Sequence, residues 1–388
     1  MKGGNEVIIW LALLIPIVMA IILFVFFRHQ TKLWEFLIPF GVSVALILFF
    51  KLSIKAVQVM DTESWGGWVT KAKYCQKWDE YIHKTCSEEY LCGINSDGMP
   101  VYCTRYYECN YVEDHPAYYE VIESNGSTIS VDEATYKKLE KQFGNSKLVD
   151  LGRDYYSIDG DMYETVWNGS DSTLEPATTT HQYVNRVLAT SDPRYKFPIV
   201  DLKVYGLFEY PKITNFYEQP SILGNGGPTM PEAEKRLNFW NAKLGKDKEV
   251  RMFILVFTDK PIQAGYDQER YWQRGNKNEF ILAIGVDKSF NVQWCHVISW
   301  TEVASIKKEA VDFVSSQGKL DLVKIVDWLG PKAKEKFVRK HFSDFDRLAV
   351  EPPLWAVILT YVVTFFVNLG VSYWIVMNQF QDNKSSSQ

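Results

Sequence analysis

Four evenly spaced cysteines are the residues of this chain best placed to do chemistry. Cys86 and Cys92 are six positions apart, and so are Cys103 and Cys109. An even spacing puts both members of a pair on the same face of a β-strand. The dipeptide Asp97-Gly98 between the pairs is typical of a two-residue hairpin turn, which requires positive φ angles. With the turn there, Cys92 faces Cys103 and Cys86 faces Cys109.

Disulfide formation is the chemistry that this hairpin favours. Opposed residues of an antiparallel pair have Cα atoms about 4.5–5.5 Å apart, within disulfide reach. The two cysteines of one strand would lie ~20 Å apart, too far for a single four-cysteine zinc site. The competing hypothesis is a zinc site in a cytosolic domain that uses His83 and His115. Two disulfides imply an oxidising compartment, and we expect the remaining Cys75 and Cys295 to be buried apolar residues.

Scattered carboxylates in the second half of the chain form an alternative site. If Asp259, Asp267, Asp287 and Glu302 converged in a cleft, with His296 beside them, they could hold a metal for the hydrolysis of phosphate esters. The sequence contains no phosphate-binding Gly-rich loop, no HExxH, no GxSxG and no Cys/His nucleophile pair at motif spacing. We therefore assign no catalytic residue, no resident metal and no cofactor, and expect no strong catalytic activity.

Three long apolar stretches indicate that parts of the chain lie in a membrane. They cover residues 7–27, 33–50 and 354–377, and each approaches the ~20 residues that a helix needs to span a bilayer. The first is too long for a signal peptide, and it is followed by five residues before apolar sequence resumes. The sequence thus predicts a two-helix transmembrane hairpin and a third span near the C-terminus.

The orientation in the membrane rests on the cysteines more than on the charges. Arg28 and Lys32 in the short connector favour its cytoplasmic location, but the other ends of the spans carry cations as well. The expected disulfides decide the matter. We therefore predict residues 56–350 outside the cytoplasm and the C-terminus inside, with the lipid bilayer and a membrane protein as partners and no nucleic acid.

The chain divides by pattern into an α+β membrane protein of five segments. These are a transmembrane hairpin (1–55), a disulfide-stapled, mainly antiparallel β domain (56–200), a small α/β domain (201–345), a third transmembrane helix (352–378) and a polar tail (379–388), which we expect to be disordered from Asp382 onward. In the β domain we expect a helix over 131–143 with Ser130 as its N-cap. In the α/β domain we expect helices over 231–245 (ended by Gly245), 266–273, 301–315 and 320–329, and strands over 250–257, 279–286 and 292–298.

Residues 231–329 contain the strand FILVF and the segment YWQRGNKN before the strand EFILAIGVD, and a membrane span follows them. With these features the segment resembles the TPM domain family, whose members are membrane-anchored α/β domains outside bacterial and thylakoid membranes. The glycine-rich turn usual after the third strand is replaced by a segment from His296 to Trp300. The acidic residues of that family have no counterparts that can be matched one by one. The resemblance implies an extracytoplasmic module that maintains or scaffolds membrane complexes.

Two functions follow from these patterns. The first is a membrane-anchored interaction or assembly protein that displays two soluble domains. The alternative is a membrane-tethered, metal-dependent phosphatase-like hydrolase. Carboxylates that converge in a pocket would favour the enzyme, whereas a broad exposed aromatic surface would favour the interaction protein.

Overall fold

The computed structural model has an α+β architecture and describes most of the chain. The described residues are 4–27, 35, 37–144, 146–152, 161–190, 192–196, 202–213 and 220–385, with side chains omitted at 4–6 and 379–385. The predicted connector around Arg28 and Lys32 lies outside them. Two compact units emerge: residues 1–63, 181–201 and 340–388 form the first, and residues 64–180 and 202–339 form the second. The division into two soluble domains at residue 200 stays a prediction.

The first unit contains three helices that are long and apolar enough to cross a membrane. They cover Val7–Phe27, Leu37–Val59 and Leu354–Asn378. The first consists of α1 (Gly4–Trp10), a 3-10 turn (Leu11–Leu13) and α2 (Leu14–Phe27), the second is α3 (Leu37–Val59), and the third belongs to α11 (Leu354–Ser385). The second helix runs further toward the C-terminus than predicted, and α11 continues through Ser385, into the tail that we expected to be disordered.

A polar contact joins two of these apolar helices. Asn368 of α11 is fully buried and donates from Nδ2 to Oγ of Ser43 in α3 at 2.8 Å and to the carbonyl of Thr364 at 2.7 Å. Among apolar helices a paired amide and hydroxyl contribute to helix association. Short elements complete the unit: α5 (Arg186–Ala189) and the 3-10 turns Pro193–Tyr195 and Phe342–Phe345.

The second unit contains most of a six-stranded, mainly antiparallel sheet. Its strand order is β7-β6-β1-β9-β8, and β10 also pairs with β1. The strands are β1 (Met60–Cys75), β6 (Tyr118–Glu123), β7 (Thr128–Val131), β8 (Lys147–Val149), β9 (Met162–Val166) and β10 (Pro176–Val184). Helix α4 (Glu133–Phe143) packs Leu139 and Phe143 into the core around Val69. Its N-cap is Asp132, which accepts from the Thr135 amide at 2.9 Å, so the Ser130 cap prediction is wrong.

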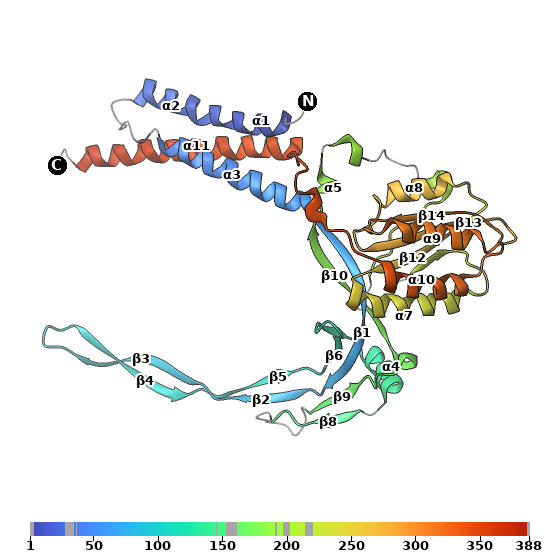
Figure 1. Ribbon diagram of the computed structural model, residues 1–388. Helices are drawn as coiled ribbons and strands as arrows, with labels where there is room; N and C mark the ends of the chain where they lie inside the picture. The colour runs from blue at the N-terminus through green and yellow to red at the C-terminus, as the bar shows by residue number, and fades with distance from the viewer. Residues whose placement is uncertain are drawn as a thin grey trace. The chain divides into compact units, whose positions relative to one another are not determined.

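A four-stranded sheet covered on both faces forms the rest of the unit (Figure 1). Its order is β11 (Ile222–Gly224), β12 (Arg251–Thr258), β13 (Glu279–Val286), β14 (Val292–Ser299), with the first three parallel and β14 antiparallel. Alternate residues of β12 point to opposite faces. Met252 and Ile254 pack with α7 (Met230–Lys248), α9 (Ala304–Ser315) and α10 (Leu322–Lys336), whereas Phe253 packs with α8 (Gln263–Tyr271) and the segment after α6 (Leu202–Tyr205).

Close packing explains an error in the predicted end of α7. Gly245 does not end α7, which continues to Lys248 and stops at Glu249 in a left-handed conformation (φ 52°). A Cβ at position 245 would lie 2.0 Å from the carbonyl oxygen of Gly66 in β1. The glycine is therefore required for the contact between helix and strand, because only a residue without a Cβ allows the two backbones so close.

Candidate functional site

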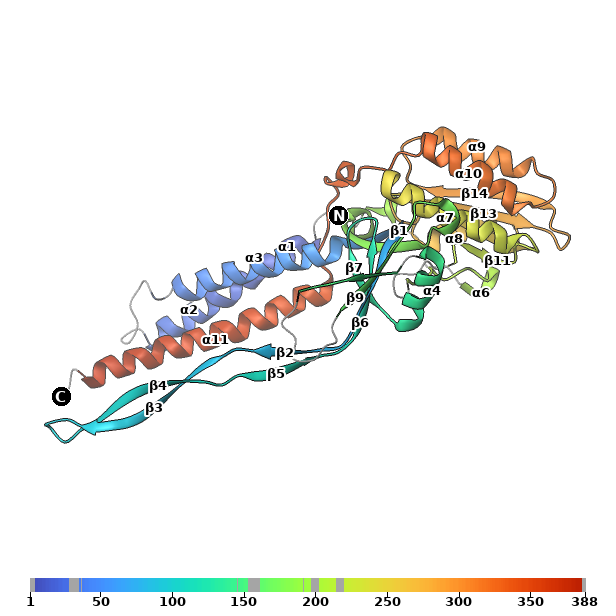
Figure 2. The same ribbon diagram turned by 90° about the horizontal axis from the view of Figure 1, so that it is seen from below.

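A long two-stranded ribbon is the most unusual feature of the second unit. Residues 78–115, called the ribbon below, form two successive antiparallel ladders (Figure 2). The base ladder pairs β2 (Trp78–Ile82) with β5 (Tyr111–His115), and the distal ladder pairs β3 (Thr85–Ile94) with β4 (Pro100–Glu108). An isolated two-stranded ladder is marginally stable in water, so the ribbon needs stabilisation beyond its backbone hydrogen bonds.

The turn of the ribbon differs from the predicted two-residue turn. The amide of Asn95 donates to the carbonyl of Met99 at 2.9 Å, and the Gly98 amide donates to the carbonyl of Asn95 at 3.0 Å. The Asn95 side chain also accepts from the amides of Asp97 and Met99. This is a three-residue loop in which Gly98 supplies the left-handed position (φ 78°). The ladder is shifted accordingly, and Ile94 pairs with Pro100.

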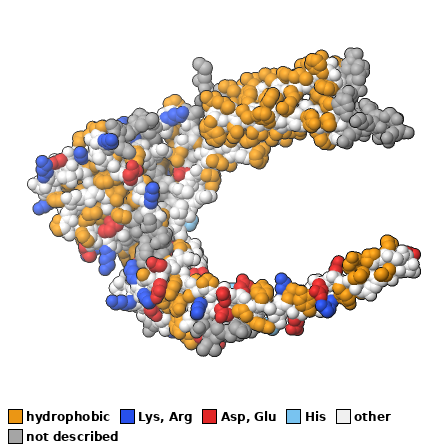
Figure 3. Space-filling model, turned by 180° about the vertical axis from the view of Figure 1, so that it is seen from behind, with side chains coloured by type: hydrophobic (Ala, Val, Ile, Leu, Met, Phe, Trp, Pro, Cys, Tyr) orange, Lys and Arg blue, Asp and Glu red, His pale blue; other side chains and the backbone are white. Residues whose placement is uncertain are grey.

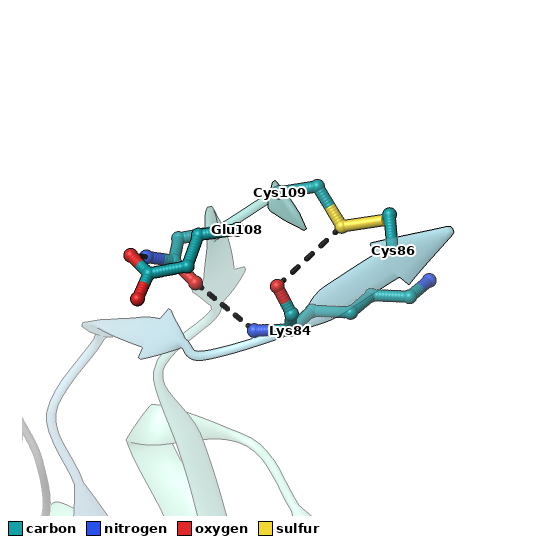
Figure 4. The surroundings of a disulfide bond; sticks show 5 residues. Lys84, Cys86, Glu108 and Cys109 are labelled. Atoms are coloured by element: carbon teal, nitrogen blue, oxygen red, sulfur yellow. Dashed lines mark hydrogen bonds between the residues drawn. A yellow bond between two sulfur atoms is a disulfide. The ribbon is translucent and has the colours of Figure 1, made fainter. Parts of the chain in front are cut away.

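Despite the shifted register, the two predicted cysteine pairs lie at disulfide distance. The Cα atoms are 5.8 Å apart for Cys86 and Cys109 and 5.6 Å apart for Cys92 and Cys103. Cys92 lies in a bulge between Leu91 and Gly93, which brings it back toward its partner strand. At the other end of the ladder, the Cys109 amide donates to the carbonyl of Lys84 at 2.9 Å. Figure 4 shows Cys109 Sγ of the first disulfide facing the same oxygen, 3.5 Å away.

Apolar side chains are exposed on both faces of the distal ladder. The end of the ribbon carries Leu91, Ile94, Met99, Val101 and Tyr102, which together are called the apolar tip. Ile94 is 71% exposed, and Tyr106, closer to the base, is 72% exposed. The space-filling view shows these hydrophobic side chains gathered at the ribbon's end (Figure 3). A monomeric soluble surface rarely leaves such a contiguous apolar patch uncovered, so this tip is a candidate interaction surface.

The ribbon also carries a strong excess of acidic residues. Its 38 residues include eight Asp or Glu and two Lys or Arg, a net charge of −6, whereas the whole chain has a net charge of −5. Two rungs of the base ladder oppose like charges, because Asp79 pairs with Asp114 and Glu80 pairs with Glu113.

One group of potential metal ligands lies on this base ladder. Glu80, Glu113 and His115 place one ligand atom each within 4.8 Å of the others, and theirs is the one such group of three in the described part of the chain. His115 Nε2 lies 2.8 Å from Glu80 Oε2, and the Trp78 ring stacks on the imidazole at 4.4 Å. His83, which we had considered as a zinc ligand with His115, instead lies edge-on to Tyr81 and does not join the group.

The carboxylates of the alternative metal site form no group of three close ligands in the described part of the chain, although Asp259 and Asp287 follow the neighbouring strands β12 and β13. Asp259 follows β12 and lies 3.5 Å from Lys288 Nζ, whereas Asp287 caps the turn after β13 by accepting from the amides of Ser289 and Asn291. The hydrogen bonds to Asp287 lower the pKa of its carboxyl, with those from Asn291 contributing most.

The other two carboxylates have separate surroundings. Asp267 lies on α8 and binds Arg270 at 2.9 Å, and Glu302 precedes α9, where its amide donates to the carbonyl of Val338. His296 contacts a different carboxylate, that of Glu269, at 2.7 Å. The predicted set therefore does not form a metal-ligand group among the residues that the structure describes.

Other ionisable groups of the second unit are buried in its core, away from the ribbon. Glu279 is completely buried and accepts from Tyr210 and, at 2.9 Å, from the amide of Asn276, and its burial raises the pKa of the carboxyl. Burial likewise raises the pKa of the Cys295 thiol to about 12, which makes it unreactive. Both Cys75 and Cys295 are buried outside the disulfides, as predicted.

Comparison with known proteins finds no match to a family model, a curated protein or a solved structure. The resemblance to the TPM family therefore stays a prediction.

Proposed function

We propose that this chain is a membrane-anchored interaction protein that binds a partner protein through its ribbon. The observation that carries the proposal is the exposed, tyrosine-rich distal ladder with its apolar tip. Tyrosine is enriched at the centres of protein interfaces, where its ring provides a large contact area and its hydroxyl a hydrogen bond.

The two disulfides make the ribbon well suited to binding a partner. Two disulfides hold the distal ladder in one conformation before any partner arrives. A preorganised surface loses less conformational entropy on association than a flexible loop does, and so it binds more tightly for the same contacts.

Charge indicates what kind of partner fits. The ribbon's net charge of −6 favours a basic partner surface and disfavours an anionic lipid surface. Attraction between opposite charges raises the association rate, while the apolar tip and the tyrosines supply most of the affinity. The partner would accordingly present an apolar groove with a basic rim.

The membrane supplies the remaining context of the proposal. Three helices are suited to span a bilayer, and disulfides persist in oxidising compartments. We therefore place residues 56–350 outside the cytoplasm and the C-terminus inside it. There the chain would act as an assembly or scaffold module on the membrane surface, the role that the TPM resemblance implies. The hydrolase alternative has no comparable support, because its carboxylates form no metal-ligand group.

Replacement of two exposed tyrosines tests the proposal. We expect Tyr102→Ser/Tyr106→Ser to reduce the apparent mass of the native complex, measured by light scattering after extraction in mild detergent. Tyr266→Ser removes a 41% exposed tyrosine from α8 and serves as the control, with no expected change. An unchanged complex in the double variant, or an equal loss in the control, would refute the role of the ribbon.

A further inference from the structure

We propose that Glu80, Glu113 and His115 bind one divalent transition-metal ion, with Zn²⁺ as the best-fitting ion, at the base of the ribbon. Their ligand atoms all lie within 4.8 Å of one another. This inference is independent of the proposed function, because the ion would bind whether or not the ribbon engages a partner.

The antiparallel register brings these three side chains together. Glu80 pairs directly with Glu113 across the ladder, and His115 follows Glu113 by two residues, so all three point to the same face. Side chains of opposed residues begin about 4.5–5.5 Å apart. Small rotations about the side-chain bonds would then bring one oxygen from each carboxylate and the imidazole Nε2 to ~2.0–2.2 Å from a common centre.

The like charges of these side chains favour the binding of a cation. Like charges directly opposed in a ladder are destabilising, and here two successive rungs oppose acidic residues. Among the described residues, no Lys or Arg forms an ion pair with Glu80 or Glu113, and the contact of Glu80 is with His115. A divalent ion would neutralise the pair of glutamates on this face.

The donor set selects the class of ion. One imidazole nitrogen with two carboxylate oxygens matches Zn²⁺ sites that keep a position open for water, whereas Mg²⁺ and Ca²⁺ prefer oxygen ligands alone. Trp78 stacks on the His115 ring at 4.4 Å with an interplanar angle of 12°, and this contact fixes the orientation of the imidazole.

A bound ion would join β2 to β5 at the base, as the disulfides join β3 to β4 further out. Because the base ladder has five residues in each strand and no disulfide, it is the part of the ribbon that gains most from such a cross-link. The ion would therefore stiffen the ribbon where it leaves the six-stranded sheet.

Equilibrium dialysis of the full chain in detergent micelles against Zn²⁺, followed by elemental analysis, tests the proposal. We expect one Zn²⁺ per chain, with affinity weakened at least about tenfold by Glu113→Gln and by His115→Ala, since loss of an outer-shell partner alone often has that effect. The Glu113 side chain has no hydrogen bond or ion pair in the described part of the chain, and its isosteric replacement leaves the backbone ladder unchanged, so the fold should stay intact.

Two variants of the same ribbon serve as controls. His83→Ala removes the neighbouring histidine, and Asp114→Asn removes a carboxylate from the opposite face of the ladder. Both are expected to retain the bound ion. Undiminished binding in Glu113→Gln and His115→Ala would overturn the site. An equal loss in either control would also overturn it, because it would show diffuse attraction to an acidic surface.

Discussion

Loss of a disulfide should melt the distal ladder of the ribbon without unfolding the rest of the unit. The disulfides close chain segments of 23 and 11 residues in sequence separation. On the chain-entropy view, such cross-links contribute ~3.4 and ~2.8 kcal/mol respectively at 25 °C. Because an isolated two-stranded ladder is marginal, either amount exceeds the stability that β3 and β4 would have alone.

Hydrogen exchange measured by mass spectrometry reports this local opening directly. In Cys86→Ser/Cys109→Ser we expect protection of the β3 and β4 amides to fall by about 2.5 powers of ten, and in Cys92→Ser/Cys103→Ser by about two. The amides of β12 and β13 lie in the buried four-stranded sheet and should keep their protection in both variants. They are the internal control within each measurement.

Two results would refute this reasoning. If the distal ladder kept full protection in both double variants, its stability would come from side-chain packing and not from the cross-links. If β12 and β13 lost protection to the same extent, the ribbon would be part of one cooperative unit with the α/β fold.

Three further predictions follow from the fold. Gly245→Ala should lower the free energy of unfolding by about 1–3 kcal/mol in chemical denaturation, because its Cβ would meet the Gly66 carbonyl; an unchanged midpoint would contradict the close contact. Burial raises the pKa of Glu123 to about 7, so the folded state favours its neutral form and stability should decline between about pH 4.5 and 7; Glu123→Gln should remove that decline, and a decline that persists would exclude this residue as its source. Single cysteines at Thr31 and Ser386 should resist a membrane-impermeant thiol reagent in intact cells, and labelling at either would reverse the proposed orientation.

Local sequence patterns predicted the elements well but not their close contacts. The strand Glu279–Val286 was predicted with its observed bounds, because an unbroken apolar run between turn residues is a strong local signal. Helix α7 was cut short at Gly245, because the reason for that glycine lies at Gly66, far away in the chain. Similarly, α10 runs on to Lys336 through Pro331, past the predicted end of the helix at residue 329.

The candidate site was predictable in part. Spacing and a turn at Asp97-Gly98 together identified the cysteine pairs. The shift in register came from the loop at Asn95 and the bulge at Cys92, which the sequence pattern does not reveal. If the predicted hairpin register is extended toward the base of the ribbon, Glu80 lies within two residues of both Glu113 and His115. The metal-ligand group could therefore have been predicted from the sequence. The separation of the carboxylates around α8 and β12 depends on tertiary packing and left no local signal.

Photo-cross-linking in intact cells tests the central claim most directly. A benzophenone amino acid would replace Tyr106 on the ribbon or, as a control, Tyr266 on α8, both of which are exposed. The proposed function predicts a discrete cross-linked adduct with one partner protein from position 106 and none from position 266. The account would be contradicted if position 106 gave no protein adduct, or if both positions gave the same products.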